Sequence, residues 1–367
     1  MNTVPIWWTS LLAVALAGAL APRSDAQITN ARRAMVKVEV MDEGLHEALE
    51  IRKSKLPLKE KEAKLEKIKI RQQFRLLVSG VAITQHEIVT PALHPTARLR
   101  VVLTLHDGSK HRAQVIGTDP RTNLALVHCP APLPHHLEPH VERIVFRQGV
   151  ELIGHSMVDP ISATGFVTQV RMSVRLRDIY GIHEADTIPL GSVFVVAAPT
   201  VPCNPGTACL DSDGRLIGIV LGCAPAQVMP RAAMPRDRGE PEARFERSFV
   251  VPSRRILKIT RALRSHKRVI RADFGFSLTS VSKALRAQLA ELPDCAATVH
   301  VLKAKGPAAQ GGVRTNDILL AVNGKAPEDV HLLREMLSEC APEKSAKLTV
   351  LRAGKKLELS VKPTADG

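Results

Sequence analysis

The sequence predicts a mainly β protein, built as a pair of six-stranded antiparallel barrels followed by a smaller domain. The first observation is a series of short apolar runs separated by turn residues, a spacing typical of barrel strands. The second is the segment Leu210–Val220, where two apolar strands flank Asp213-Gly214, a dipeptide typical of hairpin turns. The third is a basic helix predicted at Ser253–His266, after which we place the domain boundary near Lys267.

Each barrel strand is predicted from its own short run. Met35–Val40 alternates apolar and polar residues with period two, as a half-buried strand does. The other strands expected are Phe74–Ile83, Ile88–Thr90, Val101–Leu105, Ala113–Ile116, Leu124–His128, Val150–Ile153, Gly165–Val170 and Phe249–Pro252. Both tryptophans precede residue 26, so the remaining chain has one Tyr and eight Phe as aromatic residues. Its core must therefore be aliphatic.

The N-terminus is typical of a secretory signal peptide, which we place at residues 1–26. Ile6–Ala21 is a stretch of 16 residues without charge, and Ser24-Asp25-Ala26 supplies small residues before a cut ahead of Gln27. A membrane span needs about 20 apolar residues, so an uncleaved anchor is the weaker interpretation. We expect an exported protein, periplasmic or extracellular.

Two segments interrupt the strand pattern. Residues 45–73 are charged, with Pro57 suited to the first turn of a helix and Glu60/Lys64 spaced as an ion pair, so a helical hairpin is expected. Ala224–Arg247 contains four Pro and mixed charge, which favours a loop.

The segment Val201–Gly222 has the frame of a protease nucleophile loop. In trypsin-like enzymes of the HtrA/DegP type, the hairpin seen at Leu210–Val220 follows directly on Gly-Asn-Ser-Gly-Gly-Pro. That hexapeptide aligns here with Cys203-Asn204-Pro205-Gly206-Thr207-Ala208. The resemblance therefore implies a trypsin-like double β-barrel in which Pro205 occupies the serine position, without an oxygen to attack a carbonyl.

The resemblance extends to the other two members of the catalytic triad. Ile88–His94 resembles the strand that delivers Thr-Asn-Ala-His, which places Leu93 at the histidine position. Asp119–Val127 resembles Asp-Pro-x-Thr-Asp-Leu-Ala-Leu-Leu, which places Asn123 at the aspartate position. Because a triad acts as a unit, the loss of all three members predicts a pseudoprotease with no catalytic residue. In this family a regulatory loop of variable length occupies the place of residues 45–73.

Residues 268–367 resemble a PDZ domain, a small β-sandwich or barrel capped by two helices. Asp273–Phe276 matches the carboxylate-binding loop, where Gly275 permits the backbone N–H groups to point inward together. Gly306–Val313 and Asn316–Gly324 match two further family motifs, and Glu328–Cys340 supplies the groove helix. The resemblance implies a groove for peptide or protein C-termini and for unfolded proteins, lined by Phe274, Gly275, Phe276, Leu333 and Leu337.

Several alternatives remain open. The chain is an active endopeptidase if the alignment is shifted, with His94 beside the base position and Thr207 near the nucleophile. A third hypothesis is regulation of an active relative within a homo-oligomer or hetero-oligomer. HtrA proteins commonly form trimers through N-terminal aromatic residues, which are absent between Gln27 and Gln73. The PDZ fold also serves as an interdomain brace if Ser253–His266 covers its groove.

The six cysteines permit disulfides in an exported chain without proving them. The resemblance suggests a bond between Cys203 and Cys223, and Cys295 and Cys340 are a second candidate pair. Burial as apolar core residues is an equally good interpretation. The 14 His are scattered, and clusters such as His135-His136 lack a Cys at zinc spacing, so we expect no metal and no cofactor.

The formal charge of +15 is concentrated in Arg52–Arg75 and Arg254–Arg271. The favoured interpretation is that these residues form a solvated basic face. The alternative is that they bind an anionic envelope polymer. No nucleic-acid motif accompanies these segments, so a nucleic-acid partner is not expected.

Overall fold

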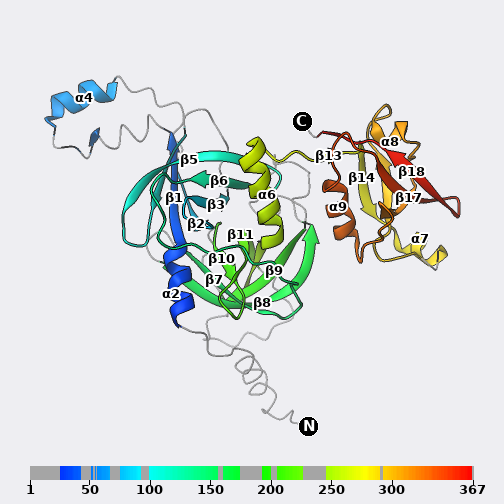
Figure 1. Cartoon of the computed structure of the whole chain (residues 1–367), viewed down its shortest axis with the longest axis horizontal. Coiled ribbons are helices and arrows are strands. Elements are labelled where there is room, and N and C mark those ends of the chain that lie inside the picture. The colour runs from blue at the N-terminus through cyan, green and yellow to red at the C-terminus, as the bar shows by residue number, and fades with distance from the viewer. Residues whose placement is uncertain are drawn as a thin grey trace, which may run out of the picture. The chain divides into compact units, whose positions relative to one another are not determined.

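The computed structural model describes residues 25–42, 51–52, 54, 56–66, 75–91, 99–155, 160–173, 192–199, 205–225, 245–289 and 292–365. The chain divides into two compact units, Met1–Val170 with Val174–Arg268, and Arg171–Ser173 with Val269–Gly367. Strands dominate both, and the first unit holds two closed six-stranded barrels (Figure 1). The predicted fold class is confirmed.

The first barrel has the strand order β1-β2-β3-β6-β5-β4. Its strands are β1 (Met35–Asp42), β2 (Arg75–Ala82), β3 (Glu87–Pro91), β4 (Leu99–Thr104), β5 (Lys110–Asp119) and β6 (Leu124–His128). The predicted alternation of β1 is confirmed, because Val36, Val38 and Val40 are buried in the barrel core while Lys37 and Glu39 are half-buried.

The second barrel has the strand order β10-β11-β12-β9-β8-β7. Its strands are β7 (Gly149–His155), β8 (Pro160–Ser173), β9 (Ser192–Pro199), β10 (Ala208–Leu210), β11 (Leu216–Pro225) and β12 (Phe245–Pro252). The core is mostly aliphatic, as expected, and also contains Phe194 and Cys209. Both ends of the loop predicted at residues 224–247 belong to strands, since β11 runs to Pro225 and β12 starts at Phe245.

The predicted hairpin at Asp213-Gly214 joins β10 to β11. Gly214 has φ +74°, a left-handed conformation that glycine adopts without steric cost. The Asp211 carboxylate accepts the N–H groups of Asp213 (2.8 Å) and Arg215 (2.9 Å), and the Arg215 side chain pairs with it at 2.7 Å. The turn is thus fixed by an aspartate side chain as well as by the glycine.

Two elements of the first unit were not predicted. Strand β9 has a uniformly apolar run, Val193–Val196, buried on both faces, so it lacks the alternation that marks a half-buried strand. Helix α2 (Asp25–Ala34) precedes β1 and buries Ala31 and Ala34. The predicted cut after Ala26 therefore falls in the first turn of α2.

Residues 1–24 lie outside the described residues, so the signal peptide remains a prediction. Within the part of the chain that the structure describes, no helix is both long and apolar enough to cross a membrane. In the insertion at residues 45–73, the described helix is α4 (Leu58–Glu66), which starts directly after Pro57 as expected.

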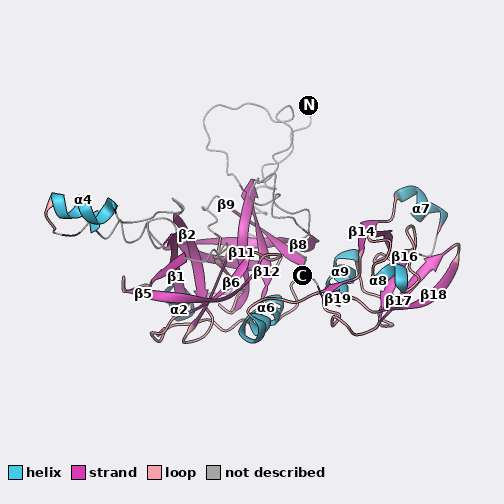
Figure 2. Ribbon diagram, turned by 90° about the horizontal axis from the view of Figure 1, so that it is seen from above, coloured by secondary structure: helices cyan, strands magenta, loops and turns pink. Residues whose placement is uncertain are grey.

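Helix α6 (Ser253–His266) has the predicted bounds and packs on β5, β11 and β12 (Figures 1 and 2). Its apolar side, including Ile256, Ile259 and Leu263, is buried, while its basic side is mostly exposed. Arg264 donates two hydrogen bonds to the Glu87 carboxylate, which lowers the pKa of Glu87 below its usual value. This ion pair links α6 to strand β3 of the first barrel.

The second unit is a five-stranded sheet of order β14-β15-β16-β17-β18 with its own core. Its elements are β13 (Ala272–Asp273), β14 (Phe276–Ser280), α7 (Lys283–Gln288), β15 (Ala297–Val301), α8 (Pro307–Gln310), β16 (Ile318–Val322), α9 (Val330–Ser338), β17 (Ala346–Arg352), β18 (Lys355–Val361) and β19 (Thr364–Ala365). Asp329 caps α9, because its side chain accepts the Leu332 N–H at 2.8 Å.

The packing of α6 yields a test of stability. Leu263 is fully buried, so Leu263→Ala removes apolar contacts and leaves a cavity, which should cost about 2–5 kcal/mol of unfolding free energy. Arg261→Ala, on the exposed side of the same helix, should change it by less than about 0.5 kcal/mol. Urea denaturation followed by circular dichroism measures both, and equal losses would contradict the packing described.

Candidate functional sites

Pro91 brings together two of the segments predicted to carry the triad. It ends β3, where it pairs with Leu124, the residue after Asn123. It also lies beside the loop before β10, because a Cβ added to Gly206 would be 3.1 Å from Pro91 Cδ. The segments holding Asn123 and Pro205 therefore meet at this end of the first barrel. Leu93 and His94 follow Pro91 in the chain but lie outside the described residues.

The Pro205-Gly206 loop is pressed against β2. The Ser79 N–H donates to the Pro205 carbonyl at 3.0 Å, and Gly206 donates to Val220 at 2.8 Å. Gly206 has φ +92°, and a Cβ there would lie 1.7 Å from the Ser79 carbonyl oxygen. Only glycine satisfies both the backbone angle and the close approach. The described end of the loop, Pro205-Gly206, is thus held against β2, with proline at the predicted nucleophile position.

Asn123 lies in the turn between β5 and β6. It is buried, has φ +54°, and its N–H donates to the Pro120 carbonyl at 3.4 Å. Asparagine tolerates this left-handed conformation better than most residues. In the same turn, Thr122 Oγ1 donates to the buried Asp119 carboxylate. Asn123 is therefore placed by the turn, and its uncharged amide cannot act as a carboxylate.

The hydroxyl groups near this loop are buried. Thr207, the nucleophile of the alternative alignment, is 4% exposed, and its Oγ1 faces Gly154, where a Cβ would approach within 2.3 Å. Ser79 is 1% exposed, and its Oγ accepts the His155 N–H at 3.0 Å. Burial lowers the pKa of His155. Neither hydroxyl is presented to a substrate in this conformation.

The loop Asp273–Phe276 precedes the edge strand β14. Gly275 has φ +74°, and its N–H donates to the Asp273 carboxylate at 2.8 Å. The second oxygen of Asp273 pairs with Lys303 Nζ at 2.7 Å. Sequence reasoning missed this internal carboxylate, although an Asp two residues before a glycine is the pattern of an Asx-turn. Of the loop amides, that of Gly275 is thus already engaged.

The side chains predicted to line the groove differ in how deeply they are buried. Phe276 is half-buried and lies beside Phe274, with ring centroids 5.6 Å apart. Phe274, Leu333 and Leu337 are 4%, 0% and 8% exposed and belong to the core of the unit. Three of the residues predicted to line a groove are thus core residues with little exposed surface, and the groove itself stays a prediction.

The cysteine predictions have mixed outcomes. Cys295 and Cys340 are free thiols and do not pair, since Cys295 donates to the Leu320 carbonyl and Cys340 to that of Met336. Cys129 and Cys209 are buried, as the apolar interpretation expects. Cys203 lies outside the described residues, so its bond to Cys223 stays a prediction.

One group of potential metal ligands occurs among the described residues. Ligand atoms of His140, Glu142 and Asp211 lie within 4.8 Å of one another. Arg215 pairs with Glu142 at 3.7 Å and with Asp211 at 2.7 Å, so a guanidinium already supplies the positive charge. We assign no metal to this group.

The comparisons with known proteins match both units. Residues 75–219 match the family described as trypsin-like peptidase domain, and residues 272–362 match PDZ domain. Curated relatives named probable periplasmic serine endoprotease DegP-like include one from Chlamydia muridarum, 26% identical over 286 residues, covering 78% of this chain and 52% of the relative. One from Brucella suis biovar 1 is 26% identical over 292 residues, covering 78% and 51%. The chain spans about half the length of these relatives.

Solved structures show the same fold. The HtrA-type protease AlgW with a tripeptide has a TM-score of 0.63 at 20% identity, covering 93% of this chain and 96% of that one. The serine endoprotease from Yersinia pestis has a TM-score of 0.56 at 19% identity, covering 95% and 100%.

The loop geometry predicts unequal costs at two glycines with positive φ. Gly206→Ala adds steric overlap to backbone strain, so it should cost about 3 kcal/mol or more of unfolding free energy. At Gly108 (φ +81°) no atom lies within 4 Å of an added Cβ, so Gly108→Ala should cost about 1 kcal/mol. Chemical denaturation of both variants measures the difference. A tolerated Gly206→Ala would show that the loop does not hold this course.

Proposed function

Because the chain is HtrA-like, with a trypsin-like peptidase fold followed by a PDZ domain, we propose that it is an exported protein that binds chain ends without cutting them. Its protease-like unit is a catalytically inactive scaffold. Its PDZ domain binds the C-termini of peptides and unfolded proteins, as a chaperone, scaffold or regulator. The printed name of the relatives, periplasmic serine endoprotease, supports export to the same compartment.

The observation that carries the inactivity proposal is Pro205, which aligns with the serine position and is held with Gly206 against β2. Proline has no side-chain nucleophile, and its nitrogen has no hydrogen to donate to a developing oxyanion. Thr207 does not replace it in the described conformation, because its side chain is buried behind Gly154. Asn123 cannot supply the carboxylate that orients a catalytic imidazole.

The second candidate is an active serine-type endopeptidase with an atypical site. It is favoured by the printed names of the relatives, and it requires a base from the segment after Pro91. It also requires a movement that exposes Thr207. The two candidates differ in whether a hydroxyl of the chain reacts covalently.

The observation that carries the binding proposal is β14, an edge strand that follows directly on the Gly275 loop and lies in the same unit as α9. An edge strand accepts a further strand through its unpaired peptide groups, and the loop amides suit a terminal carboxylate. Lys303 balances the charge of Asp273 beside that loop, so a second carboxylate is not repelled by an uncompensated one.

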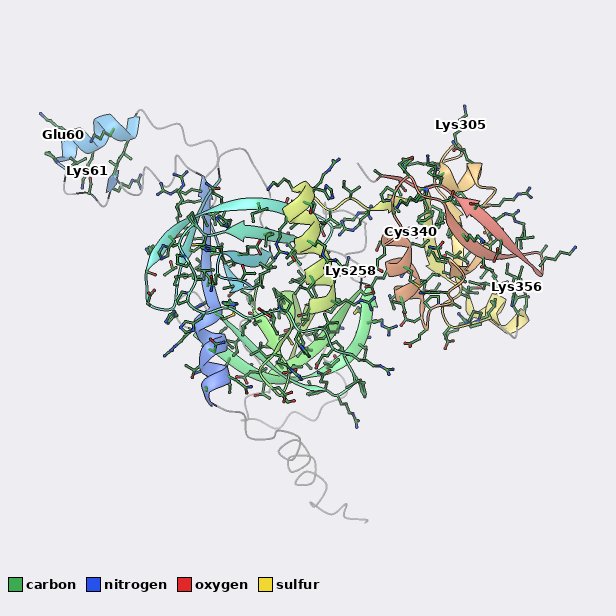
Figure 3. The ribbon with its side chains drawn as sticks, viewed as in Figure 1. Glu60, Lys61, Lys258, Lys305, Cys340 and Lys356 are labelled. Atoms are coloured by element: carbon green, nitrogen blue, oxygen red, sulfur yellow. The ribbon has the colours of Figure 1, made fainter. Side chains whose placement is uncertain are left out.

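Further partners follow from the same architecture. The exposed cations of α6, among them Arg254 and Arg261, suit an anionic envelope polymer by charge. Lys258, on the same helix, is labelled in Figure 3. Assembly as a homo-oligomer, or with an active relative, is also part of the proposal.

The catalytic proposal predicts that the exported chain leaves unfolded casein uncut and does not react with an active-site-directed fluorophosphonate. The reason is the absence of an activated hydroxyl at residue 205. Gel-based labelling and peptide release measure both properties, with an active trypsin-like protease as the positive control. Labelling that disappears in Thr207→Ala would refute inactivity and establish the second candidate.

The binding proposal predicts that the full chain binds peptides with an apolar last residue and a free carboxylate. Amidation of the peptide C-terminus should weaken binding by about 1.5–3 kcal/mol, the value of a hydrogen bond to a charged group. Fluorescence anisotropy with matched free and amidated peptides measures the change. Equal affinity for the two forms would mean that the Gly275 loop is not a carboxylate site.

A further inference from the structure

At Leu278, no other described strand of the sheet pairs with the outer edge of β14. Leu278 pairs with Val299 on β15, but both peptide groups of Val299 turn to the other side: its N–H donates to Asp317 (2.8 Å) and its carbonyl accepts from Asn316 (2.9 Å). In an antiparallel pair of this kind, the opposite residue directs its own N–H and carbonyl away from the partner strand. Leu278 therefore presents its peptide groups to the side where an added strand would bind.

A side chain of α9 already occupies this edge. Arg334 is half-buried, and its Nη2 donates to the Leu278 carbonyl at 2.9 Å. The guanidinium thus reaches from α9 to β14, across the space in which a peptide would lie. It bonds the acceptor that an added strand would need for one of its own N–H groups.

We propose that Arg334 is a latch on the peptide groove, and that an acidic side chain at the third residue from the end of a bound chain releases it. The inference rests on the proposed function, because it assumes that β14 accepts a peptide strand. It adds a charge preference and a closed resting state to that function.

The position of the acidic residue follows from register. With its carboxylate at the Gly275 loop and its direction antiparallel to β14, the peptide places its last residue beside Phe276 and its third-last residue beside Leu278. Side chains alternate along a strand, so these two peptide residues point to the same side. The first lies over the apolar residues between β14 and α9, and the second consequently meets Arg334.

The exchange of partners explains the preference. A peptide with a neutral third-last residue must break the Arg334 bond to Leu278 and offers the guanidinium no charged acceptor in exchange. A carboxylate at that position accepts two parallel N–H bonds from the guanidinium, which is a stronger pairing than one bond to a neutral carbonyl. Acidic peptides therefore compensate for opening the latch, and neutral peptides do not.

The test uses the full chain and two peptides that differ only in Glu or Gln at the third-last position, both with a free carboxylate and an apolar last residue. The native chain should bind the Glu peptide about tenfold more tightly, as one charge-assisted pair at a half-buried site allows. In Arg334→Ala the preference should disappear, and the Gln peptide should bind more tightly than it does to the native chain. Arg334→Lys, which keeps the charge but loses the planar fork, should retain part of the preference.

The matched control is Lys356→Ala. It removes the same unit charge from β18, the opposite edge strand of the sheet, where Lys356 is exposed (Figure 3). It should keep the Glu preference, whereas a loss here would assign the effect to net charge and overturn the latch. Thermal unfolding of each variant confirms that it is folded.

Two outcomes separate this inference from the proposed function. If free-carboxylate peptides bind but Arg334→Ala keeps the Glu preference, or does not strengthen the Gln peptide, the latch is overturned and peptide binding stands. If no free-carboxylate peptide binds the native chain or any variant, both are overturned.

Discussion

The two barrels of the first unit are joined through one buried serine, which uses both its backbone and its hydroxyl group. Ser79 on β2 donates its N–H to Pro205, accepts the Thr90 hydroxyl on its carbonyl (2.9 Å), and accepts the His155 N–H on its hydroxyl (3.0 Å). Its carbonyl also lies where a Cβ of Gly206 would be. Two of these hydrogen bonds and the close approach of Gly206 link the first barrel to the loop and strand of the second, while the Thr90 bond lies within the first barrel.

These contacts use backbone groups of the loop, so they do not depend on the side chain at residue 205. The Pro205 carbonyl is available as an acceptor, and proline differs from a serine at this position in lacking an N–H and a hydroxyl. Gly206 is different, because the contact with Ser79 depends on its lack of a Cβ. The position of the Pro205-Gly206 backbone therefore does not depend on which side chain residue 205 has. The trypsin-like fold does not require a serine there.

The sequence predicted those features that depend on neighbours along the chain. The alternation of β1, the Asp213-Gly214 turn and the basic helix at Ser253–His266 were predicted from local signals, and all three are confirmed. Strand β9 was missed because burial on both faces removes the alternation. Helix α2 was missed as well, since its first residues lie at the border of the predicted signal peptide.

The polar contacts around the proposed peptide groove could not be predicted from the sequence. Gly275, in the proposed carboxylate loop, could be named from its motif. The bond from Arg334 to Leu278 joins residues 56 positions apart, and it depends on how α9 approaches the sheet. Such a contact leaves no periodic signal in the sequence. The same applies to Leu333, whose complete burial reflects the packing of the whole unit.

The two edges of the sheet in the second unit are protected from other chains in different ways. The outer strand β18 begins with two exposed lysines, Lys355 and Lys356, which disfavour pairing with a second copy of the chain. The other outer strand, β14, has the sequence Phe-Ser-Leu-Thr-Ser and carries no charge of its own. The positive charge at that edge comes from Arg334 on α9, whose guanidinium bonds the Leu278 carbonyl. The exposed strand on which ligand capture would depend is thereby guarded against aggregation in concentrated solution, without placing a permanent charge in its sequence.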